Sequence, residues 1–243
     1  MVANPSEIPA SVNESKLVVN SPDILPPTNV SKLGLAVRQF GSQNHIGIIY
    51  KPAENDEVWL LNFASDKCLL NQKVFHHYVW VDCEFDSVTK SVLIPMLQEI
   101  AKENHDTIPY GIKYEPARAY FDPLGKWTGG SEGDDGLTCA TFVMAVFDRF
   151  ALPLIKTDEW PIDRPEDIEW KKTNFLEMLR NWNVSPVHII KQTEHIENQA
   201  RFKPEEVAGA TTYTDTPVGF NEVQPAAKAV LDELSAYKVR VPN

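Results

Sequence analysis

One stretch constrains the fold more than any other: a loop of glycine and acidic residues (129–136) that runs directly into an apolar helical pattern. The apolar residues recur at intervals of three and four, as on one face of an α-helix, and they are Cys139, Phe142, Val143, Val146, Phe147 and Phe150. Thr138 precedes them, and threonine can cap a helix N-terminus through its hydroxyl. The sequence therefore predicts a buried helix that begins at Cys139.

Cys139 takes the first position of this predicted helix. The free N–H groups and the dipole of a first helical turn favour a thiolate over a thiol, which lowers the cysteine pKa and makes the sulfur nucleophilic. Free cysteine is also among the most buried residue types, so Cys139 equally fits a small apolar residue on the buried face. The helix alone leaves both interpretations open, and a histidine far upstream favours the nucleophile.

The length and charge of the chain exclude several classes of protein. Its 243 residues suffice for one sizeable core, or for one core with a small appendage. A formal net charge of −11 argues against nucleic acid or an anionic membrane surface as the main partner. We expect no membrane span, because no apolar run is long enough, and no signal peptide, because residues 1–20 lack its pattern.

The cysteines indicate the compartment. Cys68, Cys83 and Cys139 are odd in number and widely spaced, unlike a disulfide framework or the paired cysteines of a zinc site. Reduced thiols in the cytoplasm fit best, although leaderless secretion is also compatible with this pattern. We expect no metal and no cofactor, since the adjacent His76 and His77 would point to opposite faces of a strand and could not share one metal ion.

The chain divides into three parts by composition and pattern. Residues 1–32 are rich in Pro, Ser and Asn and are predicted to form a flexible arm. Residues 33–155 contain the strand patterns and the cysteine helix, and are predicted to form the catalytic core. Residues 156–243 are predicted to form a mainly helical extension packed on this core. In this extension Trp160, Trp170 and Trp182 are interpreted as packing residues.

The predicted core begins with strands. They are indicated at 33–40, 45–50, 57–63 and 73–83, and the middle two are expected to form an antiparallel hairpin. Helical spacing follows over 86–104, where Pro95 either kinks the helix or marks the start of its regular part. A long loop from 114 to 136 leads to Cys139, and such loops commonly border functional sites. In the extension, helices are expected at 174–182, from 204 and at 225–237, with a short strand at 186–190.

His45 opens the second predicted strand, and Asn62 lies among apolar residues of the third. A thiolate nucleophile needs a base with a pKa of about 7 within hydrogen-bond reach, and that base needs a third group to hold its tautomer. Cys139, His45 and Asn62 can fill these roles if the hairpin packs against the N-terminus of the cysteine helix. Asp66 and Asp82 are alternative third groups, and Asp66 ranks higher because it lies just past the same strand.

These motifs together resemble a known family. His-Ile-Gly-Ile-Ile-Tyr at 45–50, Pro-Tyr-Gly at 109–111 and Leu-Thr-Cys-Ala-Thr-Phe-Val at 137–143 are similar, in this order, to the circularly permuted NlpC-type papain-like proteins, which include lecithin:retinol acyltransferase-like enzymes. The resemblance covers about residues 33–155. It implies an α+β papain-like fold, in which an antiparallel sheet packs against the cysteine helix. It further implies Cys139 as nucleophile, His45 as base, Asn62 as third polar residue and Tyr110 as a residue that lines the site. We also expect Thr138 to bind substrate.

We therefore expect a cysteine hydrolase that cleaves a peptide or isopeptide-like amide bond through an acyl-enzyme on Cys139. Two other functions remain open. One is an acyltransferase or lipid hydrolase that uses the same Cys–His site, which the absent anchor and the charge of −11 disfavour. The other is a non-catalytic binding module of the same fold, which low thiol reactivity would favour. The oligomeric state is left open.

Overall fold

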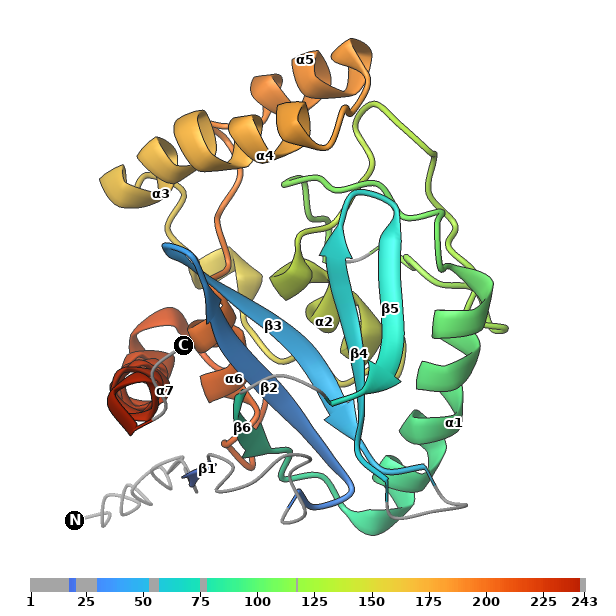
Figure 1. The fold of residues 1–243 in the computed structure, drawn as a ribbon, viewed down its shortest axis with the longest axis vertical. Helices are drawn as coiled ribbons and strands as arrows, with labels where there is room; N and C mark the ends of the chain where they lie inside the picture. The colour runs from blue at the N-terminus through green and yellow to red at the C-terminus, as the bar shows by residue number, and fades with distance from the viewer. Residues whose placement is uncertain (1–17, 21–29, 53–56, 75–77, 117, 241–243) are drawn as a thin grey trace, which may run out of the picture.

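The computed structural model describes residues 18–20, 30–52, 57–74, 78–116 and 118–240 (Figure 1). The pair His76 and His77 lies outside these ranges, as does most of the arm predicted over 1–32. The chain has the predicted α+β class, in which an antiparallel sheet packs against helices. Within the described ranges, none of the helices combines the length and the apolar character that a membrane span requires.

The sheet has six strands in the order β1-β6-β2-β3-β4-β5, and each pairing is antiparallel. The strands are β1 (Val19–Asn20), β2 (Leu33–Phe40), β3 (Gln43–Tyr50), β4 (Trp59–Ser65), β5 (Cys68–Lys73) and β6 (Val79–Asp82). The strand predicted over 33–40 is confirmed as β2. The predicted hairpin is also confirmed, because β3 pairs with β4 and places Ile48 opposite Leu61.

The strand predicted over 73–83 is wrong in its extent. Lys73 ends β5 at one edge of the sheet, where it pairs with Trp59 of β4. Val79 begins β6, which lies on the other side of β2 and pairs with it. The two residues therefore lie on opposite sides of β2 in the sheet and cannot belong to one strand. Strand β5 was not predicted, because most of its residues are polar or partly exposed, as is common for an edge strand.

The helical segments lie mainly in the second half of the chain. They are α1 (Ser87–Glu103), α2 (Cys139–Asp148), η1 (Thr157–Glu159), α3 (Pro165–Trp170), the π-helical η2 (Lys171–Phe175), α4 (Leu176–Asn181), α5 (Pro186–Glu194), α6 (Pro204–Ala210) and α7 (Phe220–Arg240). The helix predicted over 86–104 is confirmed as α1. It continues through Pro95 and is capped by the Asp86 carboxylate, which accepts from the amide of Val88 at 2.8 Å.

The strand predicted over 186–190 is wrong. These residues form the first turns of α5, where Pro186 takes the first helical position and Ser185 is the N-cap. The Ser185 hydroxyl accepts from the amide of His188 at 3.3 Å. Proline suits this position, because its missing N–H would be unpaired there and its fixed φ matches the helix. Pro186 therefore marks the start of a helix and not of a strand.

Two hydrophobic clusters cover the two faces of the sheet. The larger cluster joins one face to α1, α2, α6 and α7, and its fully buried members include Leu35, Ile48, Leu97, Phe142, Val207 and Val230. The smaller cluster lies on the other face and includes Ala36, Ile49, Leu60 and Trp80. Because α6 and α7 contribute to the larger cluster, residues 33–155 and 156–243 share one core.

The segment formed by α3, η2 and α4, together with α5, is a separate layer. Figure 1 places this layer across the end of the sheet at which the β2–β3 and β4–β5 turns lie. His45 lies at this end, two residues after β3 begins. The layer and the sheet end therefore enclose the region to which the predicted catalytic residues belong.

Candidate active site

Cys139 is the first residue of α2, as predicted. Thr138 caps the helix: its hydroxyl accepts from the Thr141 amide at 3.2 Å, and the Thr141 hydroxyl accepts from the Thr138 amide at 2.8 Å. This reciprocal pairing satisfies two N–H groups that would otherwise lack partners at a helix start. The thiol therefore sits at the positive end of a ten-residue helix, and only 6% of the residue is exposed.

His45 and Asn62 converge on this thiol from neighbouring strands. Helix α2 packs against β3 and β4, which carry the two side chains. The imidazole of His45 hydrogen-bonds to Cys139. The Nε2 atom of the same ring forms a hydrogen bond with Oδ1 of Asn62. Because Oδ1 can only accept, it fixes a proton on Nε2 and leaves Nδ1 free to take the thiol proton. Asn62 is 8% exposed, so this bond also satisfies a buried amide.

The pKa values of the two groups move toward an ion pair. Burial alone would raise the pKa of Cys139, but the nearby His45 imidazolium, its hydrogen bond and the donors from Ile46 and Tyr110 lower it below its ordinary value. Burial alone would lower the pKa of His45, but Cys139 and the bond to Asn62 raise it overall. Both shifts favour a thiolate beside an imidazolium, which is the reactive form of a cysteine nucleophile.

A short parallel β-bridge between two loop segments positions Tyr110 beside the thiol of Cys139. Tyr110 forms this parallel β-bridge with Leu137, and in it the Gly111 N–H donates to the Leu137 carbonyl at 3.1 Å. Gly136 makes this approach possible: it has a φ of +141°, and a Cβ there would lie 2.7 Å from the Gly111 nitrogen. The Tyr110 hydroxyl then hydrogen-bonds to Cys139, while burial and the charge of Cys139 raise the Tyr110 pKa.

The two aspartates that were considered as third groups have other partners. Asp66 accepts from the backbone amide of Tyr110 at 2.8 Å, so it positions the tyrosine segment. Asp82 accepts from the Ser31 hydroxyl at 2.8 Å. Among the described residues, the side chain bonded to Nε2 of His45 is that of Asn62. The geometry therefore favours Asn62 over either aspartate.

Helix α5 holds the two segments that carry Tyr110 and Cys139. The Nε2–H group of His188 donates a hydrogen bond to the Tyr110 carbonyl oxygen at 2.8 Å. The Gln192 side chain accepts from the Ile112 amide at 2.8 Å and donates to the Gly133 carbonyl at 2.9 Å. Both His188 and Gln192 are buried. Helix α5 thus holds the loop before Cys139 against the segment that contains Tyr110.

A pocket of about 630 Å³ opens beside Cys139. One wall comes from the β2–β3 hairpin and the start of α2, and the other comes from the outer helical layer with Ala200, Arg201, Phe202 and Pro204. Trp170, Met178 and Trp182 form an apolar surface on this second wall. The predicted residues Cys139, His45, Asn62, Tyr110 and Thr138 all line the pocket.

Some pocket residues were not identified from the sequence. Trp160, Trp170 and Trp182 were interpreted as packing residues, and all three belong to the larger hydrophobic cluster or pack against it. Trp170 and Trp182 also line the pocket, which was not predicted. These two tryptophans lie more than 30 positions from Cys139, so no local pattern connects them to it. Arg38 was also missed, although a two-residue turn at 41–42 is enough to place position 38 opposite His45.

Within the described ranges, no group of three or more His, Cys, Asp and Glu side chains could hold a metal ion. Comparisons of the chain with protein-family models, with curated proteins and with solved structures gave no match.

Proposed function

We propose that this protein is a cysteine hydrolase that cleaves an amide bond through an acyl-enzyme on Cys139, with His45 as the base and Asn62 as its positioning residue. The observation that carries this proposal is the hydrogen-bonded row of these three side chains at the N-terminus of α2. A buried structural cysteine needs neither a histidine with a free Nδ1 nor a third group that fixes the histidine tautomer.

The proposed reaction has two stages. The Cys139 thiolate attacks the carbonyl carbon of the amide, and a C–S bond forms while the carbonyl oxygen becomes an oxyanion. The His45 imidazolium gives its proton to the amide nitrogen as the C–N bond breaks, and the amine leaves. His45 then takes a proton from water, and the hydroxide attacks the thioester. The C–S bond breaks, a carboxylic acid leaves, and the Cys139 thiolate and His45 imidazolium are restored.

Two donors are suitably placed for the oxyanion. The backbone N–H of Cys139 and the hydroxyl of Tyr110 both lie next to the Cys139 sulfur. The phenol oxygen of Tyr110 accepts a hydrogen bond from this N–H when no substrate is present. A substrate oxyanion would take the place of the phenol as acceptor and receive hydrogen bonds from both groups. Preorganised donors of this kind stabilise the charge that develops in acyl transfer.

The resemblance to permuted NlpC-type papain-like proteins supports the same proposal. In that family the histidine strand precedes the cysteine helix, and here β3 precedes α2 in a sheet whose strands are antiparallel. We propose the papain-like fold together with this activity. The substrate we propose is a peptide or an isopeptide-like amide.

The apolar wall of the pocket favours one second candidate. Trp170, Met178 and Trp182 would also fit an acyl chain, as in an acyltransferase or lipid hydrolase. Both candidates form a thioester on Cys139. An acyltransferase passes the acyl chain to an acceptor other than water, whereas an amide hydrolase and a lipid hydrolase both use water and differ in the bond that they cleave. Intact-mass analysis of the acylated protein, with water or with an added amine as acceptor, separates hydrolysis from transfer.

The pH dependence of iodoacetamide labelling at Cys139 tests the proposal. We expect labelling of the wild type to be fast well below about pH 8, because the Cys139 pKa is lowered, and His45→Ala to slow it about tenfold at about pH 7. Peptide mass spectrometry reads each cysteine separately. Slow labelling of Cys139 that His45→Ala does not change, while Cys68 reacts normally, would contradict the proposal.

A further inference from the structure

The pocket beside Cys139 has the opposite charge to the rest of the protein. The whole chain has 34 acidic residues against 23 lysines and arginines. The pocket is lined by three cations, Arg38, Lys171 and Arg201, and none of the lining residues that the structure describes is Asp or Glu. A cationic pocket in an acidic protein concentrates anions at the site.

Arg38 is the cation closest to the proposed chemistry. In the β2–β3 pairing it lies directly opposite His45, so both side chains project from the same face of the sheet. After burial, which has the largest effect, the positive charge of Arg38 also lowers the pKa of His45. Arg38 therefore disfavours the His45 imidazolium that the proposed reaction needs, unless a bound anion offsets its charge.

Arg38 differs from three other arginines of the chain in its partners. Arg118, Arg164 and Arg201 each lie within ion-pair distance of a carboxylate. The guanidinium of Arg38 instead hydrogen-bonds to the Tyr78 hydroxyl, and it lies 5.8 Å from the ring centroid of Phe40 and 5.9 Å from that of Tyr78. In the ranges of the chain that the structure covers, no carboxylate forms an ion pair with Arg38.

The two cations of the opposite wall are already engaged. Lys171 donates to the Gln199 carbonyl at 2.7 Å. Arg201 donates to Asp167 at 3.2 Å and stacks on Trp170 at 3.8 Å from the ring centroid. Arg38 is thus the cation of this pocket that is best placed to bind an anionic group of a ligand.

We propose that the substrate carries a carboxylate that binds Arg38, and an apolar body that lies against Trp170, Met178 and Trp182. The substrate class is a peptide or N-acyl amino acid with a carboxylate close to the amide that is cleaved. This inference rests on the proposed function and specifies its substrate. The planar guanidinium suits a carboxylate, and the bound anion would offset the repulsion between Arg38 and the His45 imidazolium.

Two small alkylating reagents test this proposal without knowledge of the substrate. Iodoacetate carries a carboxylate and iodoacetamide does not, and each forms an S–C bond to the thiolate as iodide leaves. We expect the rate ratio of iodoacetate to iodoacetamide at Cys139 to exceed the ratio at Cys68 of the same protein about tenfold. Cys68 lies outside the pocket lining and is partly exposed, so it corrects for the intrinsic reactivity of the reagents.

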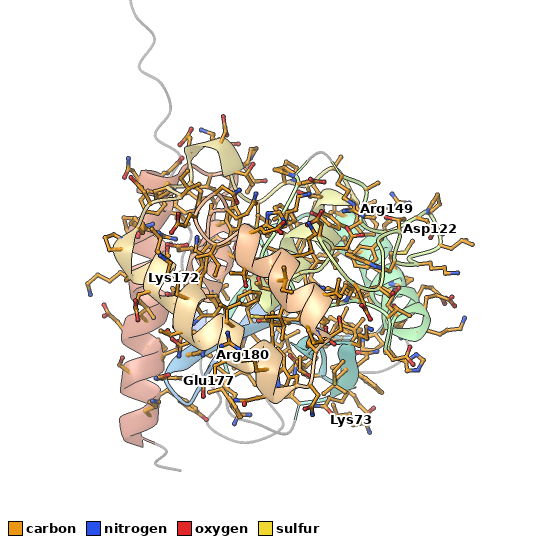
Figure 2. All side chains as sticks on the ribbon, turned by 90° about the horizontal axis from the view of Figure 1, so that it is seen from above. Lys73, Asp122, Arg149, Lys172, Glu177 and Arg180 are labelled. Carbon is orange, nitrogen blue, oxygen red and sulfur yellow. The ribbon has the colours of Figure 1, made fainter. Side chains whose placement is uncertain are left out.

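Substitutions assign the preference to one residue. Arg38→Gln should reduce the ratio at Cys139 to that at Cys68, and Arg38→Lys should retain part of the preference. Arg180→Gln is the matched control, because it removes the same charge from an exposed position on α4 outside the pocket lining (Figure 2). It should leave the ratio unchanged.

The possible failures are distinguishable. Rapid labelling of Cys139 by both reagents, with the same ratio as at Cys68, would overturn this inference and leave the proposed hydrolase intact. A preference for iodoacetate that persists in Arg38→Gln would also overturn it, because another group would then bind the anion. Failure of both reagents to label Cys139 faster than Cys68 would overturn the inference and the proposed function together.

Discussion

At the scale of single residues, the histidine is subject to two opposing influences from its neighbours. Asn62 hydrogen-bonds to His45 and raises its pKa, whereas Arg38 lies across the strand pair and lowers it. Burial disfavours the charged ring, and Cys139 favours it. The protonation state of His45 is therefore a balance that single substitutions shift in known directions.

The pKa of His45, followed by NMR titration of its ring proton, should move in opposite directions in two variants. Asn62→Ala removes a bond that favours the imidazolium, so the pKa falls and the ion pair with Cys139 is lost at a lower pH. Arg38→Gln removes a repulsive charge, so the pKa rises and the ion pair persists to a higher pH. Shifts of the same sign in both variants would mean that neither side chain acts on His45 as described.

At the scale of elements, the site depends on a bridge between two loop segments. The Tyr110 segment and the Leu137 segment pair because Gly136 lets the backbones approach. Helix α5 then holds both segments through His188 and Gln192. The cysteine helix therefore starts at a fixed position relative to Tyr110.

Two glycines in the same loop offer a matched comparison. Gly136→Ala places a Cβ 2.7 Å from the Gly111 nitrogen, while Gly133→Ala meets nothing within 4 Å and only adds a residue with a φ of +81°. We expect Gly133→Ala to lower the free energy of unfolding by about 1 kcal/mol. Gly136→Ala should cost at least about twice that and slow the labelling of Cys139. Urea denaturation and peptide mass spectrometry measure the two effects.

Equal stability of the two variants, with normal labelling of Cys139 in Gly136→Ala, would contradict this account. The bridge at Gly136 would then not position the cysteine helix.

Elements with a strong local signal were predictable, and elements defined by distant contacts were not. Helix α2 and strand β2 carry regular apolar patterns, and the cap at Thr138 lies beside the helix that it starts. The partners Cys139, His45 and Asn62 followed from residue types on predicted elements. Strand β5 has little apolar pattern because it lies at an edge. The pocket wall at Trp170 and Trp182 arises only when the outer helices pack over the sheet end.

At the scale of the whole molecule, the last third of the chain belongs to the main core. Val207 of α6 and Val230 of α7 lie in the same cluster as Leu35 of β2 and Phe142 of α2. Helix α6 packs directly on β2 and β3. The strands that carry Arg38 and His45 are therefore supported by residues that lie far downstream in the sequence.

Unfolding in urea should be a single transition that includes the C-terminal helices. Val207→Ala should lower the free energy of unfolding by about 2 kcal/mol, because Val207 is fully buried between α6 and the sheet. Far-UV circular dichroism and tryptophan fluorescence should report the same lowered midpoint. Val187→Ala, at a position on α5 that is 62% exposed, should change the midpoint very little.

Midpoints that differ between the two probes in Val207→Ala would contradict a shared core. Residues 156–243 would then unfold as a unit of their own.

The position of α5 in the sequence has a consequence for the synthesis of the protein. Cys139 leaves the ribosome about 50 residues before the side chains of His188 and Gln192, which hold its loop against the Tyr110 segment. The nascent chain thus carries the thiol and the histidine before the site can close around them. The order of the elements thus delays the completed site until translation has passed α5.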